Sequence, residues 1–190
     1  MVMREISWVA LIGGVLTLVV VLVSVFVPWW RLSAGENLIE VGVSPFDLDV
    51  SLLGRPLTIA VVGAFNLSAV LLFVVSGVVM LIYSVVPTRS YARHFVGFAY
   101  SKPLAVLLSF VVLVFGLSMV LQVVAKLSVP VWGSATVVLP AGFVPGVDLR
   151  VSLVVTATFQ WSFWLAVFAS GVCVVARLYH RRFGRVSLSS

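Results

Sequence analysis

Charged residues are scarce in this chain of 190 residues: they make up 9% of it, whereas apolar residues make up 62%. Soluble domains carry about 25% charged and about 45–50% apolar residues, so this sequence lacks the polar side chains that would cover a water-soluble globule. The same composition excludes disorder, because disordered chains are poor in bulky apolar residues. The composition therefore indicates an integral membrane protein.

Cysteine is almost absent, with Cys173 as the single example. One thiol cannot close a disulfide within the chain, which excludes a disulfide-stapled secreted domain. It also excludes a membrane thiol oxidoreductase, since that chemistry requires a redox-active pair. Because Cys173 lies within a long apolar run, we interpret it as a small buried apolar side chain.

Four long runs contain no Asp, Glu, Lys, Arg or His: residues 6–27, 57–86, 103–124 and 154–176. A helix needs about 20 apolar residues to cross about 30 Å of hydrocarbon, so each run predicts a transmembrane helix. Pro103 is expected in the first turn of the third helix, and Pro87 is expected to end the second. Ionisable side chains within a membrane mark ion and proton paths, so their absence argues against charge-driven transport.

The segments that connect these runs differ in charge. The N-terminus, the loop 87–102 and the tail 177–190 hold eight cationic residues and one acidic residue. The loops 28–56 and 125–153 hold four cationic and five acidic residues. The positive-inside rule therefore places both termini and the loop 87–102 in the cytoplasm of a multi-pass cell-membrane protein with a single membrane domain, residues 1–190. The formal net charge of +6 then reflects topology, and no nucleic acid is expected as a partner.

Six cytoplasmic arginines are expected to contact the anionic lipid headgroups of the bilayer, where each cation gains about 1 kcal/mol. They are Arg89, Arg93, Arg177, Arg181, Arg182 and Arg185. Docking of an acidic partner is the alternative use of these cations.

The two outer loops resemble each other in sequence. Residues 27–30 read Val-Pro-Trp-Trp and residues 129–132 read Val-Pro-Val-Trp. Further along, residues 47–52 read Asp-Leu-Asp-Val-Ser-Leu and residues 148–153 read Asp-Leu-Arg-Val-Ser-Leu. At the same offset, Gly14 in the first run corresponds to Gly116 in the third. We interpret this as an internal duplication of a helix–loop–helix hairpin about a pseudo-twofold axis along the membrane normal, or as a repeat confined to the loops.

Both six-residue blocks alternate between apolar and polar residues, which is typical of a half-buried strand. Leu38–Val43 and Thr136–Leu139 are the candidate partner strands. An isolated two-stranded unit is marginally stable, so we expect both loops to join in one antiparallel sheet that caps the bundle, with its apolar face toward the helices and its carboxylates outward. In that sheet Asp49 and Arg150 would form a cross-strand pair.

Few residues in the sequence point to chemistry. His94 and His180 lie far apart without companion ligands, and the outer carboxylates do not follow the spacing of a calcium loop, so no catalytic residue, metal or cofactor is predicted. The candidate interaction residues are the outer aromatic and charged ones: Trp29, Trp30, Asp47, Asp49, Trp132, Asp148 and Arg150. Each helix also carries a pair of small residues four apart that would let helices approach closely: Ala10/Gly14, Ala64/Ser68, Ala105/Ser109 and Ala166/Ser170.

Four spans, cytoplasmic ends, a tryptophan just after the first span and a β-rich first outer loop resemble the claudin/PMP22-like tetraspan superfamily. That family carries a Trp…Gly-Leu-Trp signature, in which Trp29 or Trp30 matches the first tryptophan and Gly42-Val43…Phe46 stands at the second element. The pair of loop cysteines found in the family is absent from this chain. The resemblance implies interaction through the outer sheet, as in adhesion or association with other membrane subunits, and it carries over no catalytic residue.

We therefore expect a non-enzymatic α-helical membrane protein, a four-helix bundle with a small outer antiparallel sheet. It would act as a structural, adhesive or accessory subunit through this outer β-rich cap. Its partners would be other membrane or envelope proteins, or further copies of itself. The alternative is a small transporter or channel made of two parallel repeats, with a polar path between Asn66, Gln122 and Gln160. A lipid-modifying enzyme is a third possibility and requires a polar pocket. Low Asn, Gln and Cys content with heavy use of valine is compatible with a thermophilic source.

Overall fold

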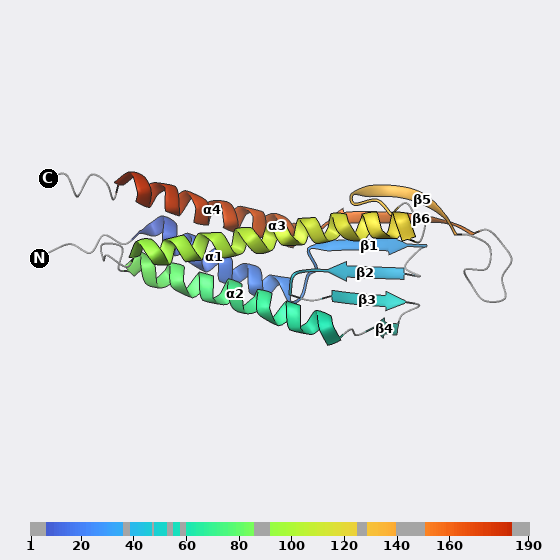
Figure 1. Ribbon diagram of the computed structural model, residues 1–190, viewed down its shortest axis with the longest axis horizontal. Helices are drawn as coiled ribbons and strands as arrows, with labels where there is room; N and C mark the ends of the chain where they lie inside the picture. The colour runs from blue at the N-terminus through green and yellow to red at the C-terminus, as the bar shows by residue number, and fades with distance from the viewer. Residues whose placement is uncertain are drawn as a thin grey trace, which may run out of the picture.

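The computed structural model describes residues 7–35, 39–46, 48–52, 55–57, 60–85, 92–124, 129–139 and 151–183. Within them, four helices form a bundle: α1 (Trp8–Ser24), α2 (Ala60–Val85), α3 (Ala92–Val124) and α4 (Trp161–Phe183). Six strands form one sheet: β1 (Trp30–Ala34), β2 (Ile39–Val43), β3 (Leu48–Leu52), β4 (Arg55–Leu57), β5 (Gly133–Leu139) and β6 (Val151–Phe159). α1 begins and α4 ends at the end of the bundle that lies away from the sheet (Figure 1).

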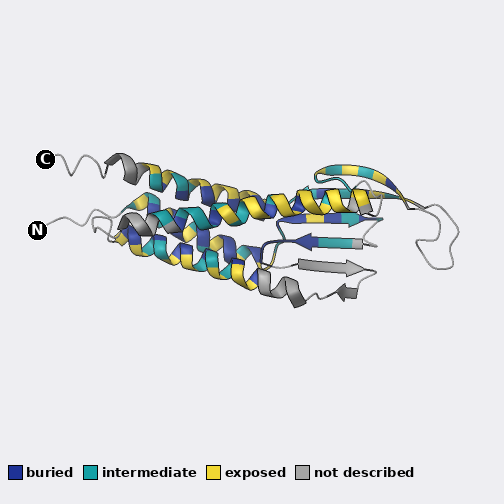
Figure 2. Ribbon diagram, viewed as in Figure 1, coloured by how far each residue is buried: buried dark blue, intermediate teal, exposed yellow. Residues whose placement is uncertain are grey.

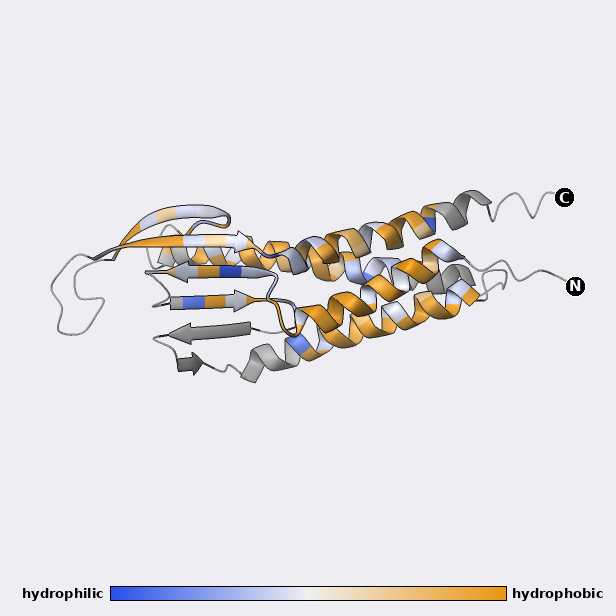
Figure 3. Ribbon diagram, turned by 180° about the vertical axis from the view of Figure 1, so that it is seen from behind, coloured by the Kyte–Doolittle hydropathy of each residue, from blue (hydrophilic) through white to orange (hydrophobic). Residues whose placement is uncertain are grey.

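The four predicted helices are present, and three of them are long and apolar enough to cross a membrane. The apolar stretches of these three are Asn66–Val85, Ala99–Val120 and Trp161–Leu178. α1 is equally apolar but has 17 residues, a length of about 26 Å. Exposed positions alternate with buried ones along each helix (Figure 2), and apolar residues dominate the described parts of all four (Figure 3).

Two helix boundaries differ from the prediction. Residues 154–159 belong to β6, so α4 begins at Trp161 and the predicted start at Val154 is wrong. Val155 and Ala157 are buried whereas Val154 is exposed, which is the alternation of a strand. The sequence does not show this alternation, because nearly all residues of the run are apolar. α3 begins at Ala92, so Pro103 lies inside the helix and not in its first turn.

Pro103 leaves one backbone acceptor of α3 without its helical donor. In a regular helix the N–H of residue 103 would donate to the carbonyl of Ala99, and proline has no N–H. Ser76 of α2, which is fully buried, donates its hydroxyl to this Ala99 carbonyl. A hydroxyl from the neighbouring helix thus replaces the missing N–H, which is how proline is tolerated within apolar helices.

α1 and α2 approach each other most closely at two glycines. A Cβ atom at Gly14 would lie 3.0 Å from the carbonyl oxygen of Gly77, and a Cβ at Gly77 would lie 2.9 Å from the side chain of Leu18. Gly14 and Ala10 are both buried, so the predicted small pair of α1 is used for helix packing. Gly116 of α3, which the proposed duplication aligns with Gly14, has no atom within 4 Å of its Cβ position.

The two outer segments join in one antiparallel sheet with strand order β4-β3-β2-β1-β6-β5, as predicted. The two segments are connected by the pairing of β1 with β6, in which Leu32 lies opposite Ala157. The sheet does not lie flat across the end of the bundle. Its strands run along the long axis of the molecule, and α3 continues beside them (Figure 1).

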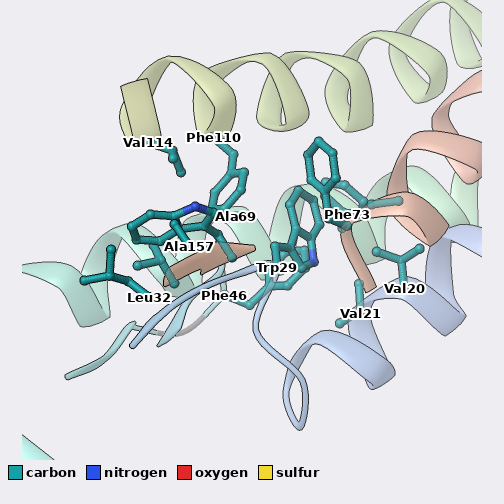
Figure 4. Packing of buried hydrophobic residues seen from close by; sticks show 14 of the residues in the cluster. Val20, Val21, Trp29, Leu32, Phe46, Ala69, Phe73, Phe110, Val114 and Ala157 are labelled. Carbon is teal, nitrogen blue, oxygen red and sulfur yellow. The ribbon is translucent and has the colours of Figure 1, made fainter. Parts of the chain in front are cut away.

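The sheet has one apolar and one polar face. Leu32, Val155 and Ala157 are buried in the same cluster as Phe110 and Val114, so α3 covers this face (Figure 4). The opposite face carries Arg31, Ser33, Glu40, Thr156 and Thr158, which alternate with the buried positions along their strands. The expected division into an apolar inner and a polar outer face is therefore present, although a helix and not the end of the bundle covers the apolar face.

The strand order is not twofold symmetric. In the proposed duplication β1 corresponds to β5 and β3 corresponds to β6. β1 pairs with β6, yet β3 lies between β2 and β4, and β5 lies at the edge beyond β6. Asp49 lies opposite Gly42, in a strand that is not adjacent to β6. Arg150 lies outside the described residues, so the Asp49–Arg150 pair stays a prediction. The duplication stays a prediction from the sequence.

The centre of the core is Trp29, which is fully buried where the helices meet the sheet (Figure 4). Four phenylalanine rings surround its indole edge to face, at centroid distances from 5.1 to 6.3 Å: Phe46 after β2, Phe73 of α2, Phe110 of α3 and Phe163 of α4. Each such pair contributes about 0.5–1.5 kcal/mol beyond the burial of apolar area.

Hydrogen bonds of Trp29 reach the remaining elements at this junction. Its indole N–H donates to Ser24 Oγ in the last turn of α1, at 2.7 Å. Its backbone N–H donates to the carbonyl of Val43 at the end of β2, and its carbonyl accepts from the N–H of Gln160, just before α4. One residue thus contacts all four helices and the sheet.

The Ser76–Ala99 bond is tested by a double-mutant cycle with Pro103. Ser76→Ala leaves the buried carbonyl without a donor and is expected to lower the free energy of unfolding by about 1–3 kcal/mol. Pro103→Ala restores the helical N–H, so the same serine substitution should cost clearly less in that background. Unfolding in detergent micelles measures both costs, and equal costs would contradict the assignment.

Gly14→Ala is expected to push α1 away from α2, because the new methyl group would meet the backbone of Gly77. The expected loss in the free energy of unfolding is about 1–3 kcal/mol. Gly116→Ala is the matched control and should stabilise the protein slightly, since alanine favours a helix over glycine by about 1 kcal/mol where there is room. Equal effects of the two substitutions, measured by thermal unfolding, would refute the close packing.

Candidate functional site

A groove lies between α2 and α3 and has a volume of about 600 Å³. One wall comes from residues 66–72 of α2 and the other from residues 105–117 of α3. Its third side is the turn after β2, where Val43, Ser44 and Pro45 lie against it. The groove forms because α2 and α3 diverge toward the sheet (Figure 1), so their facing side chains separate.

The lining of the groove is apolar except for a few neutral polar groups. Leu72, Val106, Phe110, Leu113 and Leu117 supply most of the large side chains. The polar groups are Asn66, Ser68, Ser109 and Ser44. Pockets for small ligands commonly have a volume of about 300–1,000 Å³ and combine apolar walls with a few polar groups, which is the make-up of this groove.

Among the polar residues of the groove, Asn66 is the best candidate for binding a ligand. It is 8% exposed and lines the groove. Its amide makes no hydrogen bond within the part of the chain that the structure describes. These amide atoms keep some accessible surface and are not among the buried polar atoms without a partner, so they can bind a polar group that enters the groove.

One of the predicted small pairs, Ala105/Ser109, and one member of another, Ser68, line the groove. On α1 and α4 the pairs Ala10/Gly14 and Ala166/Ser170 are buried between helices. Ala105 and Ser109 of α3 are exposed and line the groove, as does the exposed Ser68 of α2. These small side chains keep the groove open, and their four-residue spacing is the sequence signal that could have indicated it.

The tryptophans proposed as interaction residues have different surroundings. Trp29 and Trp30 are 0% and 2% exposed, so the prediction that their side chains contact a partner is wrong. The indole N–H of Trp30 donates to the carbonyl of Val131 at 2.9 Å and joins the two outer segments. Trp132 is 66% exposed and lies 6.2 Å from the ring of Trp164, so it remains available for contact.

Most of the proposed charged interaction residues lie beyond what the structure describes. Asp47, Asp148 and Arg150 fall outside the described residues, and only the backbone of Asp49 is placed. On the polar face of the sheet, Arg31 and Glu40 form an ion pair at 3.2 Å. Both side chains are well exposed, and such a pair contributes about 0–1 kcal/mol.

The cations proposed to contact lipid headgroups can be placed in part. Arg177 lies over the ring of Tyr100, with Cζ 4.0 Å from the centroid, and so joins α4 to α3. Arg93 lies in α3, and Arg181 and Arg182 lie in the last turns of α4, as backbone positions only. Arg89 and Arg185 lie outside the described residues. Headgroup contact by these arginines stays a prediction.

The three residues of the alternative transport path are not brought together. Asn66 lines the groove, Gln122 is exposed near the end of α3, and the amide of Gln160 donates to Thr158 Oγ1 at 3.0 Å. The aromatic cluster around Trp29 fills the space between the helices at the sheet end. The described residues contain no group of three or more His, Cys, Asp or Glu side chains that could hold a metal ion.

No protein-family model matches the chain, and a search of curated proteins finds no match. The resemblance to the claudin/PMP22-like superfamily therefore stays a prediction, based on the residues named above.

Proposed function

We propose that the chain is a multi-pass membrane protein whose four helices cross the bilayer, with both termini in the cytoplasm and the sheet outside. The exposed apolar side chains on all four helices support insertion. Charge supports the orientation: Arg177, Arg181 and Arg182 lie in the last two turns of α4, at the end where α1 begins, which is the cationic end expected in the cytoplasm. The sheet, with its Arg31–Glu40 pair, lies at the opposite end.

Within the membrane it acts as a structural or accessory subunit that contacts another membrane protein and does not itself catalyse a reaction. The observation that carries this proposal is an exposed apolar stripe on the outer half of α3. Its members are between 54% and 75% exposed: Val112, Phe115, Met119, Val120 and Val123. Buried residues make up 22% of the apolar stretch of α3, against 39% in α2 and α4, so α3 is the least covered of the three long helices.

The position and composition of the stripe favour a protein partner over bulk lipid alone. α3 has 33 residues, about 50 Å, and continues beside the sheet beyond the ends of α1 and α4 (Figure 1). Gly116 lies among the stripe residues and has open space around its Cβ position. Glycine weakens an exposed helix, whereas it lets the backbone of a second membrane helix approach closely.

Site-specific photocrosslinking in native membranes tests this proposal. A benzophenone amino acid at Phe115 or Met119 should give discrete adducts with another polypeptide. The matched control is Leu22 of α1, which is 66% exposed on an apolar face that has no glycine with open space beside it, and it should give none. Absence of protein adducts at both Phe115 and Met119, or equal adducts at Leu22, would contradict a partner specific to α3. Adducts of the chain with itself would identify the partner as a second copy.

A further inference from the structure

The dimensions of the groove between α2 and α3 limit what can occupy it. Along α3 it extends from Ala105 to Leu117, about 18 Å. With a volume of about 600 Å³, its mean cross-section is about 33 Å², less than half of the about 80–110 Å² that a helix with its side chains occupies. A helix with its side chains is about 10–12 Å across and does not fit. Carbon atoms pack at about 3.5–4.0 Å, so a single hydrocarbon chain does.

Polar groups are placed unevenly along the groove. α2 and α3 run in opposite directions, so Asn66 lies toward the sheet, whereas Leu72 and Ala105 lie toward the middle of the bundle. The inner part is apolar apart from Ser109. Asn66 is 8% exposed and lines the groove, and its amide has no partner among the described residues. An alkyl chain has no group that can hydrogen-bond to Asn66. The ester or amide group at the head of the chain has a carbonyl oxygen, which can accept a hydrogen bond from the amide N–H of Asn66.

We propose that this groove binds one hydrocarbon chain of a membrane lipid, with the chain along Leu72, Val106 and Phe110 and with the carbonyl at its head hydrogen-bonded to Asn66. The proposal rests on membrane insertion but not on the partner proposed for α3. The described lining is uncharged, so recognition depends on the chain and its linkage and not on the charge of the headgroup. Phe110 also contacts Trp29, so a bound chain would pack directly against the junction of the helices and the sheet.

The test uses the full chain in vesicles of unlabelled phosphatidylcholine with a small fraction of phosphatidylcholine that carries a diazirine in one acyl chain. After irradiation, label should concentrate on residues 66–72 and 105–117 relative to the exposed surface of α1. Ser109→Trp fills the groove and should lower this labelling at least about fivefold. The control, Leu108→Trp, places the same side chain at a position on α3 that is 56% exposed and does not line the groove, and it should leave the labelling unchanged.

A second variant keeps the test decisive if the tryptophan disturbs folding. Asn66→Leu preserves the size of the side chain but removes its hydrogen bond, and about fivefold less lipid should remain bound during purification in mild detergent, as counted by native mass spectrometry. Even labelling of all exposed helices, or labelling and retention that neither variant changes, would overturn the proposal. So would a polypeptide crosslinked within the groove in native membranes.

Discussion

The burial of Trp29 between four phenylalanine rings is the interaction on which the rest of the structure depends. α2, α3, α4 and the turn after β2 each supply one ring, and α1 supplies Ser24 as acceptor for the indole N–H. Apolar helices have little hydrophobic reason to associate within a bilayer, so packing and hydrogen bonds must hold them together. Trp29 supplies both at one point and fixes the sheet against the helices through its backbone bonds to β2 and Gln160.

Much of the architecture follows from composition and periodicity. The absence of ionisable residues from long runs predicts the helices, and the alternation in two similar blocks predicts strands that join in one sheet. Other features cannot be predicted from the sequence, because contacts between residues far apart in the chain determine them. The strand ending at Phe159 is hidden in an apolar run, Pro103 is internal because Ser76 supplies the missing donor, and Trp29 is core because four distant phenylalanines surround it. The small residues Ala105 and Ser109 are a sequence signal for the groove, but its size depends on how far α2 and α3 diverge, which the sequence does not reveal.

The structure is asymmetric in a way that bears on function. α1 and α2 are in close contact through Gly14 and Gly77, whereas α3 leaves its outer half exposed and borders an open groove. The two proposals place different ligands on the two sides of α3, a protein helix on the Gly116 stripe and a lipid chain beside Ser109. Both would add contacts to the helix that the bundle itself covers least.

Hydrogen exchange of the Trp29→Ala variant in detergent micelles or nanodiscs is the most direct test of the central claim. Removing this side chain leaves a cavity where the helices meet the sheet, which costs about 3–5 kcal/mol for a buried tryptophan. The central role of Trp29 predicts faster hydrogen exchange in β1, in β6 and in the turns of α2 and α4 around Phe73 and Phe163, all in the same variant. Trp132→Ala is the exposed control and should change the exchange little. Unaltered protection of the sheet and helices in Trp29→Ala would contradict this role.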